Sequence, residues 1–376
     1  MNILVIKNPY RSQPHGGGEL HTMEVMKHLR EQGHKIYFAG TCRYLLEMAK
    51  AKEFSVTPTE WAGQEAVSED ALLKFLFSKG RINKSWKKFL QRAKETKKID
   101  LVYILSWNEK FLVPPIAKKL GMKVVFVEHV LLGRFIKANP WRNSYIKNAN
   151  QAITIAVSKA VKQSVVDCGV DSDKVKVVYN GVDLNAFPVS PERSTNEEVR
   201  IGTISRLCRQ KGLEDLIKAT AVLKITWPEI EVDIVGRGDA KGKLKRLIKS
   251  LGLEENVHLL GSKPRHQLSR FLETLDIFTY TPTYGEAFGL ALAEAGLAGL
   301  PSVVTNVGGV PEVVCNKQTG IVVPPHDIEL QARAIGFLIE NGDKRQQMGE
   351  AARKRIQQYF SRDRMLAEIT KIIESK

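Results

Sequence analysis

Residues 277–297 read IFTYTPTYGEAFGLALAEAGL and contain, in order, a strand, a polar loop and a helix. The first four residues form an apolar run of the length of a buried strand. Small and apolar residues make up most of the helix, which carries one acidic residue, Glu294. In an open parallel sheet, ligands bind in the loops beyond the carboxyl ends of the strands. The loop that carries Glu286 is therefore a candidate binding site.

Outward from this stretch, short apolar runs alternate with helical segments along the chain. Strands separated by helices form parallel sheets covered on both faces, which is the doubly wound α/β class. The part from 328 to 373 is expected to be mostly helical. Strands are predicted at 3–6, 36–39, 101–105, 124–127, 153–157 and 175–178 in the first half, and at 199–204, 232–235, 257–259, 277–280 and 302–305 in the second.

A turn-rich segment interrupts the alternation near the middle of the chain. Asn180-Gly181 is closely followed by Pro188 and Pro191, a composition typical of a linker. A length of 376 residues also agrees with two domains of ordinary size. We therefore predict two Rossmann-like domains, 1–182 and 183–360, that face a central cleft.

Composition excludes several classes of protein. Hydrophobic residues make up 43% and charged residues 26%, as in an ordinary globular chain. No apolar run approaches the roughly 18 residues that span a bilayer, and the first residues are too short an apolar run for a secretory leader. The four cysteines are widely spaced without a CxxC motif, which fits a reducing compartment and excludes a disulfide framework or a zinc ribbon. We expect a cytoplasmic protein.

The net charge of +16 is unevenly distributed. Residues 1–183 carry 30 Lys and Arg against 17 Asp and Glu, whereas the remainder carries 27 against 24. This asymmetry indicates an anionic partner for the first half. Nucleic acid, an acidic membrane surface and a phosphorylated substrate all qualify.

The two acidic residues of the opening stretch favour a ligand with hydroxyl groups at both ends. On a continuous helix Glu286 and Glu294 would lie about 12 Å apart along the axis, roughly the span from the sugar to the ribose of a nucleotide-sugar. Amides near Phe288 and Gly289 would open the helix and face an anion between them. A carboxylate inside an apolar helix needs a hydrogen-bonding partner, and the hydroxyl groups of a ribose would supply one to Glu294. The alternative is that Glu294 faces solvent.

Two cations follow the predicted strand 199–204. Arg206 and Lys211 precede a helix, so they could neutralise a diphosphate, Arg as a planar fork and Lys as a point charge. The alternative is a solvated basic loop.

Two glycine-rich loops also follow strands. Gly16, Gly17 and Gly18 would let backbone amides approach an anion at a helix N-terminus. Gly236-x-Gly238 ends another strand, but the next glycine is out of step with GxGxxG, which argues against NAD binding. His129 follows the strand 124–127. A lone histidine can be purely structural, but a position at the carboxyl end of a strand in the basic half makes His129 a candidate catalytic residue.

The order and spacing of the motifs over nearly the whole chain carry a family resemblance. They are Gly16-Gly17 with Gly33-His34, Val157-Ser158, Asn180-Gly181-Val182-Asp183, Arg206 with Lys211-Gly212, Gly236-x-Gly238, Glu286-x-Phe288-Gly289 with Glu294, Gly299-x-Pro301 and Gly308-Gly309-x-x-Glu312. Together they resemble glycosyltransferase family 4, the retaining sugar transferases of GT-B fold.

The resemblance implies a role for each candidate residue. His129 would lie by the reacting sugar, and Arg206 and Lys211 would bind the diphosphate of the donor. Glu286 would bind hydroxyls of the donor sugar and Glu294 the ribose. The donor would further contact Gly16, Gly17, Gly18, Gly236, Gly238, Phe288, Gly289, Leu290 and the backbone near Lys263. The final helix, 361–376, would cross back onto the first domain.

The reaction that the resemblance implies is sugar transfer from a nucleotide-sugar, UDP by family frequency, to a hydroxyl of a glycan or lipid-linked acceptor. The anomeric configuration would be retained, no metal or cofactor would be needed, and the setting would be envelope polysaccharide or lipopolysaccharide synthesis. The rival hypothesis is a basic nucleotide- or nucleic-acid-binding protein without transferase activity, although zinc spacing, a P-loop and RNP-type aromatics are lacking. The oligomeric state is not predicted.

Residues 72–98 carry ten basic residues against one acidic residue, Glu95, with interleaved apolar and aromatic side chains. Two interpretations are open. The segment is an amphipathic helix suited to an anionic membrane surface, peripheral on the inner face of the cell membrane, or it is an ordinary domain helix whose apolar side packs on the sheet.

Overall fold

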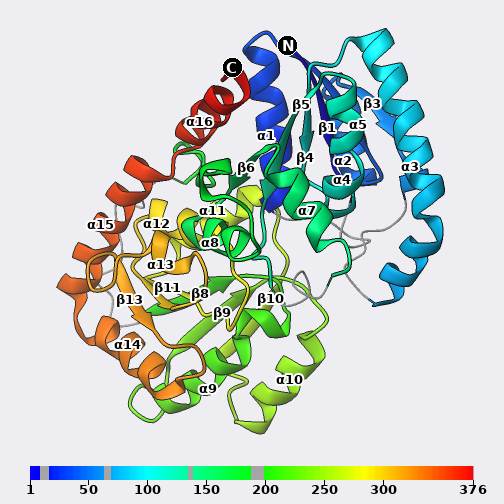
Figure 1. Ribbon diagram of the computed structural model, residues 1–376. Helices are drawn as coiled ribbons and strands as arrows, with labels where there is room; N and C mark the ends of the chain where they lie inside the picture. The colour runs from blue at the N-terminus through cyan, green and yellow to red at the C-terminus, as the bar shows by residue number, and fades with distance from the viewer. Residues whose placement is uncertain (9–16, 63–68, 134–138, 188–198, 376) are drawn as a thin grey trace. The chain divides into compact units, whose positions relative to one another are not determined.

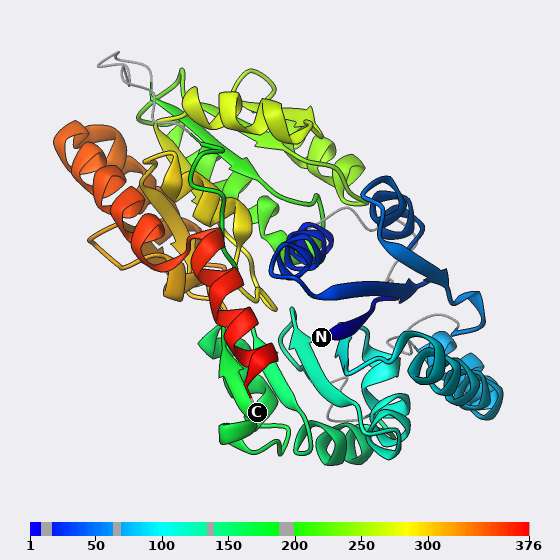
Figure 2. The same ribbon diagram turned by 90° about the horizontal axis from the view of Figure 1, so that it is seen from above.

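Two parallel sheets, one in each half of the chain, organise the fold, and helices flank the strands of each (Figures 1 and 2). The computed structural model describes residues 1–8, 17–62, 69–133, 139–187 and 199–375. It divides into one unit of Met1–Val178 with Leu366–Lys376, and a second of Tyr179–Met365. The predicted α/β class with two doubly wound, Rossmann-like sheets is confirmed.

The first sheet has seven strands in the order β3-β2-β1-β4-β5-β6-β7, all parallel. The interior of its central strands is apolar because helices cover both faces. In β1, every residue from Ile3 to Ile6 is at most 2% exposed. The strands are β1 Asn2–Ile6, β2 Lys35–Gly40, β3 Ser55–Pro58, β4 Leu101–Ile104, β5 Lys123–Glu128, β6 Ile153–Ala156 and β7 Val175–Val177.

The helices of the first unit connect these strands, and the long α3 lies on the outside of the unit (Figure 1). They are α1 Gly17–Glu31, α2 Arg43–Ala51, α3 Glu69–Lys97, α4 Trp107–Leu112, α5 Pro114–Lys119, α7 Arg142–Ala149 and α8 Lys159–Val166. The predicted N-cap of α8 is present, since the Ser158 hydroxyl accepts a hydrogen bond from the Val161 amide at 3.1 Å.

The second sheet has six parallel strands in the order β10-β9-β8-β11-β12-β13. The strands are β8 Arg200–Ile204, β9 Glu231–Val235, β10 Val257–Gly261, β11 Ile277–Tyr280, β12 Ser302–Thr305 and β13 Gly320–Val323. The helices are α9 Leu213–Leu223, α10 Lys241–Ser250, α11 Arg265–Glu273, α12 Leu290–Leu297, α13 Val310–Val313, α14 Ile328–Glu340 and α15 Gly342–Tyr359.

Two edge strands are absent from the sequence-based prediction. In β3 the residues are SVTP, and none of them is buried, so the apolar signal of a covered strand is missing. In β13 the residues are GIVV, and the glycine packs so closely on β12 that a Cβ would stand 2.2 Å from the Ser302 carbonyl oxygen. Pairing with a neighbouring strand, rather than local pattern, defines both.

The segment predicted as a linker is packed within the second unit as far as residue 187. Val182 forms a parallel bridge with Ser361, and Asp183 forms an ion pair with Arg362 at 2.7 Å. Phe187 is 1% exposed. Residues 188–198, which include both prolines of the predicted linker, lie outside the described residues. Helix α16, Arg362–Glu374, begins in the second unit, and its residues from Leu366 belong to the first, where Glu374 contacts His34 at 3.2 Å.

Candidate functional site

The loop between β11 and α12 carries Glu286, and the loops after the two flanking strands, β8 and β12, hold it in place. Gly212 has a φ of +62° and approaches the loop so closely that a Cβ would stand 1.9 Å from the Thr281 carbonyl oxygen. On the other side, the Thr305 hydroxyl donates to the carbonyl oxygen of the residue after Thr281 at 2.5 Å. The Gly309 amide donates to the Glu286 carbonyl oxygen at 3.0 Å. Packing between loops thus fixes the backbone of Glu286.

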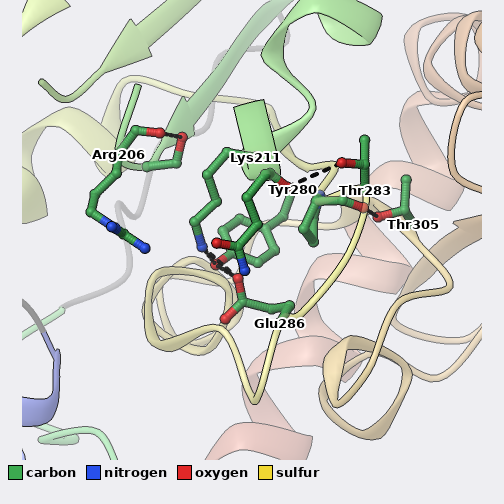
Figure 3. A network of polar contacts seen from close by, with 9 residues as sticks. Arg206, Lys211, Tyr280, Thr283, Glu286 and Thr305 are labelled. Atoms are coloured by element: carbon green, nitrogen blue, oxygen red, sulfur yellow. Dashed lines mark hydrogen bonds and ion pairs between the residues drawn. The ribbon is translucent and has the colours of Figure 1, made fainter. Parts of the chain in front are cut away.

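Three side chains meet at this loop, Lys211, Tyr280 and Glu286 (Figure 3). Lys211 Nζ forms an ion pair with Glu286 Oε2, and Nζ also donates to the Tyr280 hydroxyl at 2.8 Å. That hydroxyl donates in turn to Glu286 Oε2 at 2.9 Å. Burial, then the Glu286 carboxylate, raises the pKa of Tyr280 well above its usual value, so the phenol stays protonated and acts as a donor.

The contacts leave one oxygen of Glu286 with its lone pairs available. Both side-chain hydrogen bonds to Glu286 from the described part of the chain fall on Oε2. A carboxylate oriented at one oxygen by a cation and a phenol is a rigid acceptor at the other. Oε1 is therefore suited to hydrogen bonds from hydroxyl groups of a ligand.

Glu294 lies inside α12 and is buried, at 8% exposed. The interpretation in which it faces solvent is therefore wrong. Arg265, the first residue of α11, supplies the partner that a buried carboxylate needs, with its Nη2 at 3.2 Å from Glu294 Oε1. Burial raises the pKa of Glu294 to about 7, although the Arg265 charge acts in the opposite direction.

The continuous helix assumed for the spacing of the two carboxylates is not observed. Helix α12 begins at Leu290, and Glu286 precedes it in the loop. Gly285 and Gly289, with φ of +69° and +93°, place the chain in the left-handed region that non-glycine residues avoid. The 12 Å estimate, which assumed helical rise, therefore does not apply.

Arg206 extends from the loop after β8, beside the group in Figure 3, and is exposed. Its charge lowers the pKa of Tyr280, against the larger effect of burial, so it contributes to the electrostatics of the site. Gly236 and Gly238 have a structural reason to be glycine, because Cβ atoms on them would stand 1.8 and 2.1 Å from the carbonyl oxygens of Ser205 and Leu207. They let the β9 loop support the loop that carries Arg206.

The predicted contacts around the start of α12 differ in kind. The Phe288 side chain is 1% exposed and packs on Phe360, with ring centroids 5.5 Å apart, so it belongs to the core and only its backbone can face a ligand. Gly289 is the N-cap of α12, and Leu290 is half-buried at its first position. Lys263 follows β10 and is half-buried.

In the first unit, the glycine loop and the end of β1 form one polar group. Gly16 lies outside the described residues, whereas Gly17 and Gly18 open α1. Lys7 lies beneath them, so that a Cβ on Gly18 would stand 3.2 Å from its Nζ, and Lys7 forms an ion pair with Glu19 at 3.1 Å. A cation thus supports this helix start from below.

His129 follows β5 and packs edge-on against His21 of α1, with ring centroids 4.6 Å apart. No group among the described residues hydrogen-bonds the buried Nε2 of His129. Burial, with the neighbouring His21 and the charges of Lys7 and Lys110, lowers the pKa of His129 well below its usual value. The imidazole is therefore neutral at pH 7, with one nitrogen to donate and one to accept.

A buried ion pair holds the strand end that carries His129. Lys110 Nζ lies 2.8 Å from Glu128 Oε2 and donates to the Val127 carbonyl oxygen at 2.7 Å. Tyr145 donates to the other oxygen of Glu128 at 2.8 Å. Both charged side chains are at most 3% exposed. The two residues before His129 are thus tied to α4 and α7.

The second unit brings Lys211 and Glu286 into direct contact, with Arg206 on the neighbouring loop; Glu294 pairs with Arg265 instead. His129 and the glycine loop belong to the first unit.

Four residues of these polar groups were not identified from the sequence. Tyr280 ends β11, Arg265 begins α11 and Lys7 follows β1. A polar residue at the end of a strand or helix could have been selected as a candidate from the sequence. Lys110 lies inside α4, and no sequence pattern distinguished it.

No group of three His, Cys, Asp or Glu side chains suited to hold a metal ion occurs in the described part of the chain.

Two family models match the chain. The model described as Glycosyltransferase Family 4 matches residues 15–186, and the model described as Glycosyl transferases group 1 matches residues 189–355. The first match covers the strands of the first sheet except β1, and the second covers all six strands of the second sheet. The chain belongs to the glycosyltransferases of family 4 type with the GT-B fold.

Relatives of known annotation agree with this assignment. The amylovoran biosynthesis glycosyltransferase AmsK of Erwinia amylovora is 27% identical over 231 residues, which are 60% of this chain and 57% of AmsK. A D-inositol 3-phosphate glycosyltransferase of Corynebacterium jeikeium is 32% identical over 195 residues, 47% of this chain and 46% of the relative. The chain thus spans about half the length of the curated relatives it matches.

Among solved structures, Anabaena HepE (Alr3699) in complex with UDP superposes with a TM-score of 0.83 at 23% identity, over 100% of both chains. At this identity the likeness establishes the shared fold.

Proposed function

We propose that this protein transfers a sugar from a nucleotide-sugar, a UDP-sugar in the first place, to a hydroxyl group of a glycan or lipid-linked acceptor. The observation that carries the proposal is the Lys211–Tyr280–Glu286 group, a carboxylate oriented at one oxygen and available at the other, beside a cation. This arrangement can bind sugar hydroxyls and a diphosphate at the same loop. HepE, the structural neighbour, was solved with UDP and with UDP-glucose.

The donor would be bound mainly by the second unit. Lys211 and Arg206 would face the diphosphate, Glu286 Oε1 would accept from hydroxyls of the transferred sugar, and Glu294 would accept from the ribose. The amides of Phe288, Gly289 and Leu290 at the start of α12 would add partial positive charge toward the phosphates. Gly236, Gly238 and the backbone near Lys263 would line the nucleotide end.

The reaction breaks the bond between the anomeric carbon and the diphosphate oxygen and forms a bond from that carbon to the acceptor oxygen. We infer retention of configuration, with the acceptor attacking from the face of the leaving group and its proton passing to a phosphate oxygen. Lys211 and Arg206 would stabilise the charge that develops on the diphosphate, so that this role does not require a metal. The neutral His129, with Gly16, Gly17 and Gly18, would contact the reacting sugar and phosphate from the first unit.

For the acceptor we infer a growing cell-envelope polysaccharide or lipopolysaccharide, with transfer to a lipid-linked form at the inner face of the cell membrane. The name of AmsK refers to amylovoran biosynthesis, which supports this class of product. The rival, a nucleic-acid-binding protein without transferase activity, is not favoured, because no observation at the Lys211 site requires it.

The test is to incubate the purified protein with UDP-, GDP- and ADP-sugars and to follow donor hydrolysis and thermal stabilisation. We expect slow hydrolysis of one donor, with stabilisation by the same compound, and loss of both in Glu286→Gln and Lys211→Met. An exposed lysine of α10, Lys245→Met, is the matched control and should keep both. If no nucleotide-sugar is bound or hydrolysed, the proposal fails.

A further inference from the structure

The apolar side of α3 is occupied by the protein's own core. Phe75, Ile82, Trp86 and Leu90 are each at most 3% exposed. The Phe75 ring packs edge-on against Trp141, with centroids 4.9 Å apart. Trp86 and the other inward side chains are therefore not available to enter a membrane. The interpretation of 72–98 as an ordinary domain helix thus holds for this side of α3, but Phe75 packs on Phe111 and Trp141, which belong to α4 and to the start of α7, where the sheet was expected.

The outward side of the same helix is cationic. Arg81, Lys84, Lys87, Lys88 and Arg92 are exposed, and none of them forms an ion pair with any described residue. No acidic residue occurs from 71 to 94 in the sequence. From Arg81 to Arg92 the helix rises about 17 Å. Arg81, Lys84, Lys88 and Arg92 share one side of the helix at spacings of three and four residues, and Lys87 lies beside them.

Two large apolar side chains extend this cationic face at its N-terminal end. Phe77 is 91% exposed and Leu76 is 49% exposed. Phe77 is followed on its side of the helix by Arg81, Lys84 and Lys88, at spacings of three and four residues. A nearly fully exposed aromatic ring does not contribute to the core. Its presence beside five cations that have no ion-pair partner among the described residues calls for a partner with both anionic and apolar parts.

We propose that this face of α3, made of Leu76, Phe77, Arg81, Lys84, Lys87, Lys88 and Arg92, adsorbs to an anionic phospholipid bilayer. The cations face the lipid phosphates, and Phe77 with Leu76 enters the boundary between headgroups and acyl chains. A bilayer offers apolar volume beneath its charge. Nucleic acid also offers charge and stacking surfaces, but it has no partner for the aliphatic Leu76 beside Phe77.

No helix in the described ranges is long and apolar enough to cross a membrane. Each Lys or Arg near an anionic surface strengthens adsorption about fivefold at low salt. Four such residues, as in Lys84, Lys87, Lys88 and Arg92, therefore strengthen adsorption up to several hundredfold. This is enough for reversible binding, and added salt would screen it.

The experiment is sedimentation of the full chain with vesicles of phosphatidylcholine alone or with phosphatidylserine, at low and high salt and without any sugar donor. The charge variant carries K84Q, K87Q, K88Q and R92Q. The matched control carries K241Q, K245Q, K249Q and R246Q on α10, which removes the same four charges from exposed positions of the second unit. The apolar contribution is tested with F77S and with the conservative F77W.

We expect phosphatidylserine vesicles to retain the wild type and the α10 control at low salt, and the α3 charge variant to bind at least tenfold more weakly. F77S should bind severalfold more weakly, and F77W should restore binding. The proposal is overturned if anionic vesicles do not retain the wild type, or if both charge variants lose binding equally. It is also overturned if the α3 charges prove necessary for binding a single-stranded oligonucleotide but not for binding vesicles. Because no donor is present, the result is independent of the proposed sugar transfer.

Discussion

Replacing Lys211 with Met removes the cation that contacts both Tyr280 and Glu286 while keeping most of the side-chain volume. In the wild type, the side chains of Lys211 and Glu286 are 11% and 13% exposed, so the pair is largely shielded from water. In Lys211→Met the Glu286 carboxylate keeps only the Tyr280 hydroxyl as a side-chain partner among the described residues. Leaving a buried charge with incomplete hydrogen bonding costs about 1–3 kcal/mol.

The same substitution removes positive charge from the leaving diphosphate. Loss of one preorganised group that stabilises developing charge lowers kcat about 10²–10³-fold. We therefore expect donor hydrolysis to fall by that factor, and Tm to fall by several degrees. A double substitution, Lys211→Met with Glu286→Gln, should restore most of the stability because no charge is left unpaired, but it should not restore activity.

Hydrolysis rates and thermal denaturation of wild type, both variants and Lys245→Met distinguish these effects. The reasoning is refuted if Lys211→Met keeps activity within threefold of the wild type. It is also refuted if the double variant is no more stable than the single one, since the ion pair would then not carry the cost.

Further predictions concern the charged and glycine positions around both sites. The pKa of Glu294 is raised from 4.5 to about 7, so ionisation of this residue opposes folding; relative to Glu294→Gln, the wild type should lose up to about 3 kcal/mol of unfolding free energy as pH rises from 4.5 to about 7, as measured by urea denaturation. Gly212→Ala should destabilise the protein by more than 2 kcal/mol and abolish donor binding, because its Cβ would clash with a backbone oxygen; Gly252→Ala, with the same φ of +62° but open space, should cost only about 1 kcal/mol and keep binding. Lys110→Met should cost about 3–5 kcal/mol by leaving the Glu128 charge buried, and Lys110→Met with Glu128→Gln should recover much of it in the same denaturation assay.

The central strands were predictable because helices cover each of them on both faces. Such a strand is a nearly continuous apolar run, which can be seen in the sequence alone. The edge strands were not predictable, since the SVTP residues of β3 are partly or fully exposed and only its parallel pairing with β2 makes it a strand. A second limit appears at the start of α12. The small and apolar residues from Ala287 onward are compatible with a longer helix. The helix begins only at Leu290, because Gly289 before it has the left-handed conformation.

The candidate site was predictable to the extent that its residues lie at strand ends. Lys211 and Glu286 could be selected because their loops follow strands of a parallel sheet, where side chains converge. Glu294 could be selected because it is the one acidic residue of an apolar helix, where a carboxylate needs a partner. Their partners could not be selected in the same way. Arg265 lies 29 positions from Glu294 in the sequence, and no local pattern connects the two.

By itself, the sequence determined the α/β class, the two repeated alternations and the residues that stand at the carboxyl ends of the strands, because burial and turn preferences act on neighbours along the chain. Only the tertiary structure decided which of those residues touch. Lys211 meets Glu286 because β8 and β11 lie side by side and Gly212 lets their loops approach. Likewise, the outward side of α3 is charged and carries the exposed ring of Phe77, because the other side of the helix is packed in the core. Which side is packed depends on residues distant in the sequence.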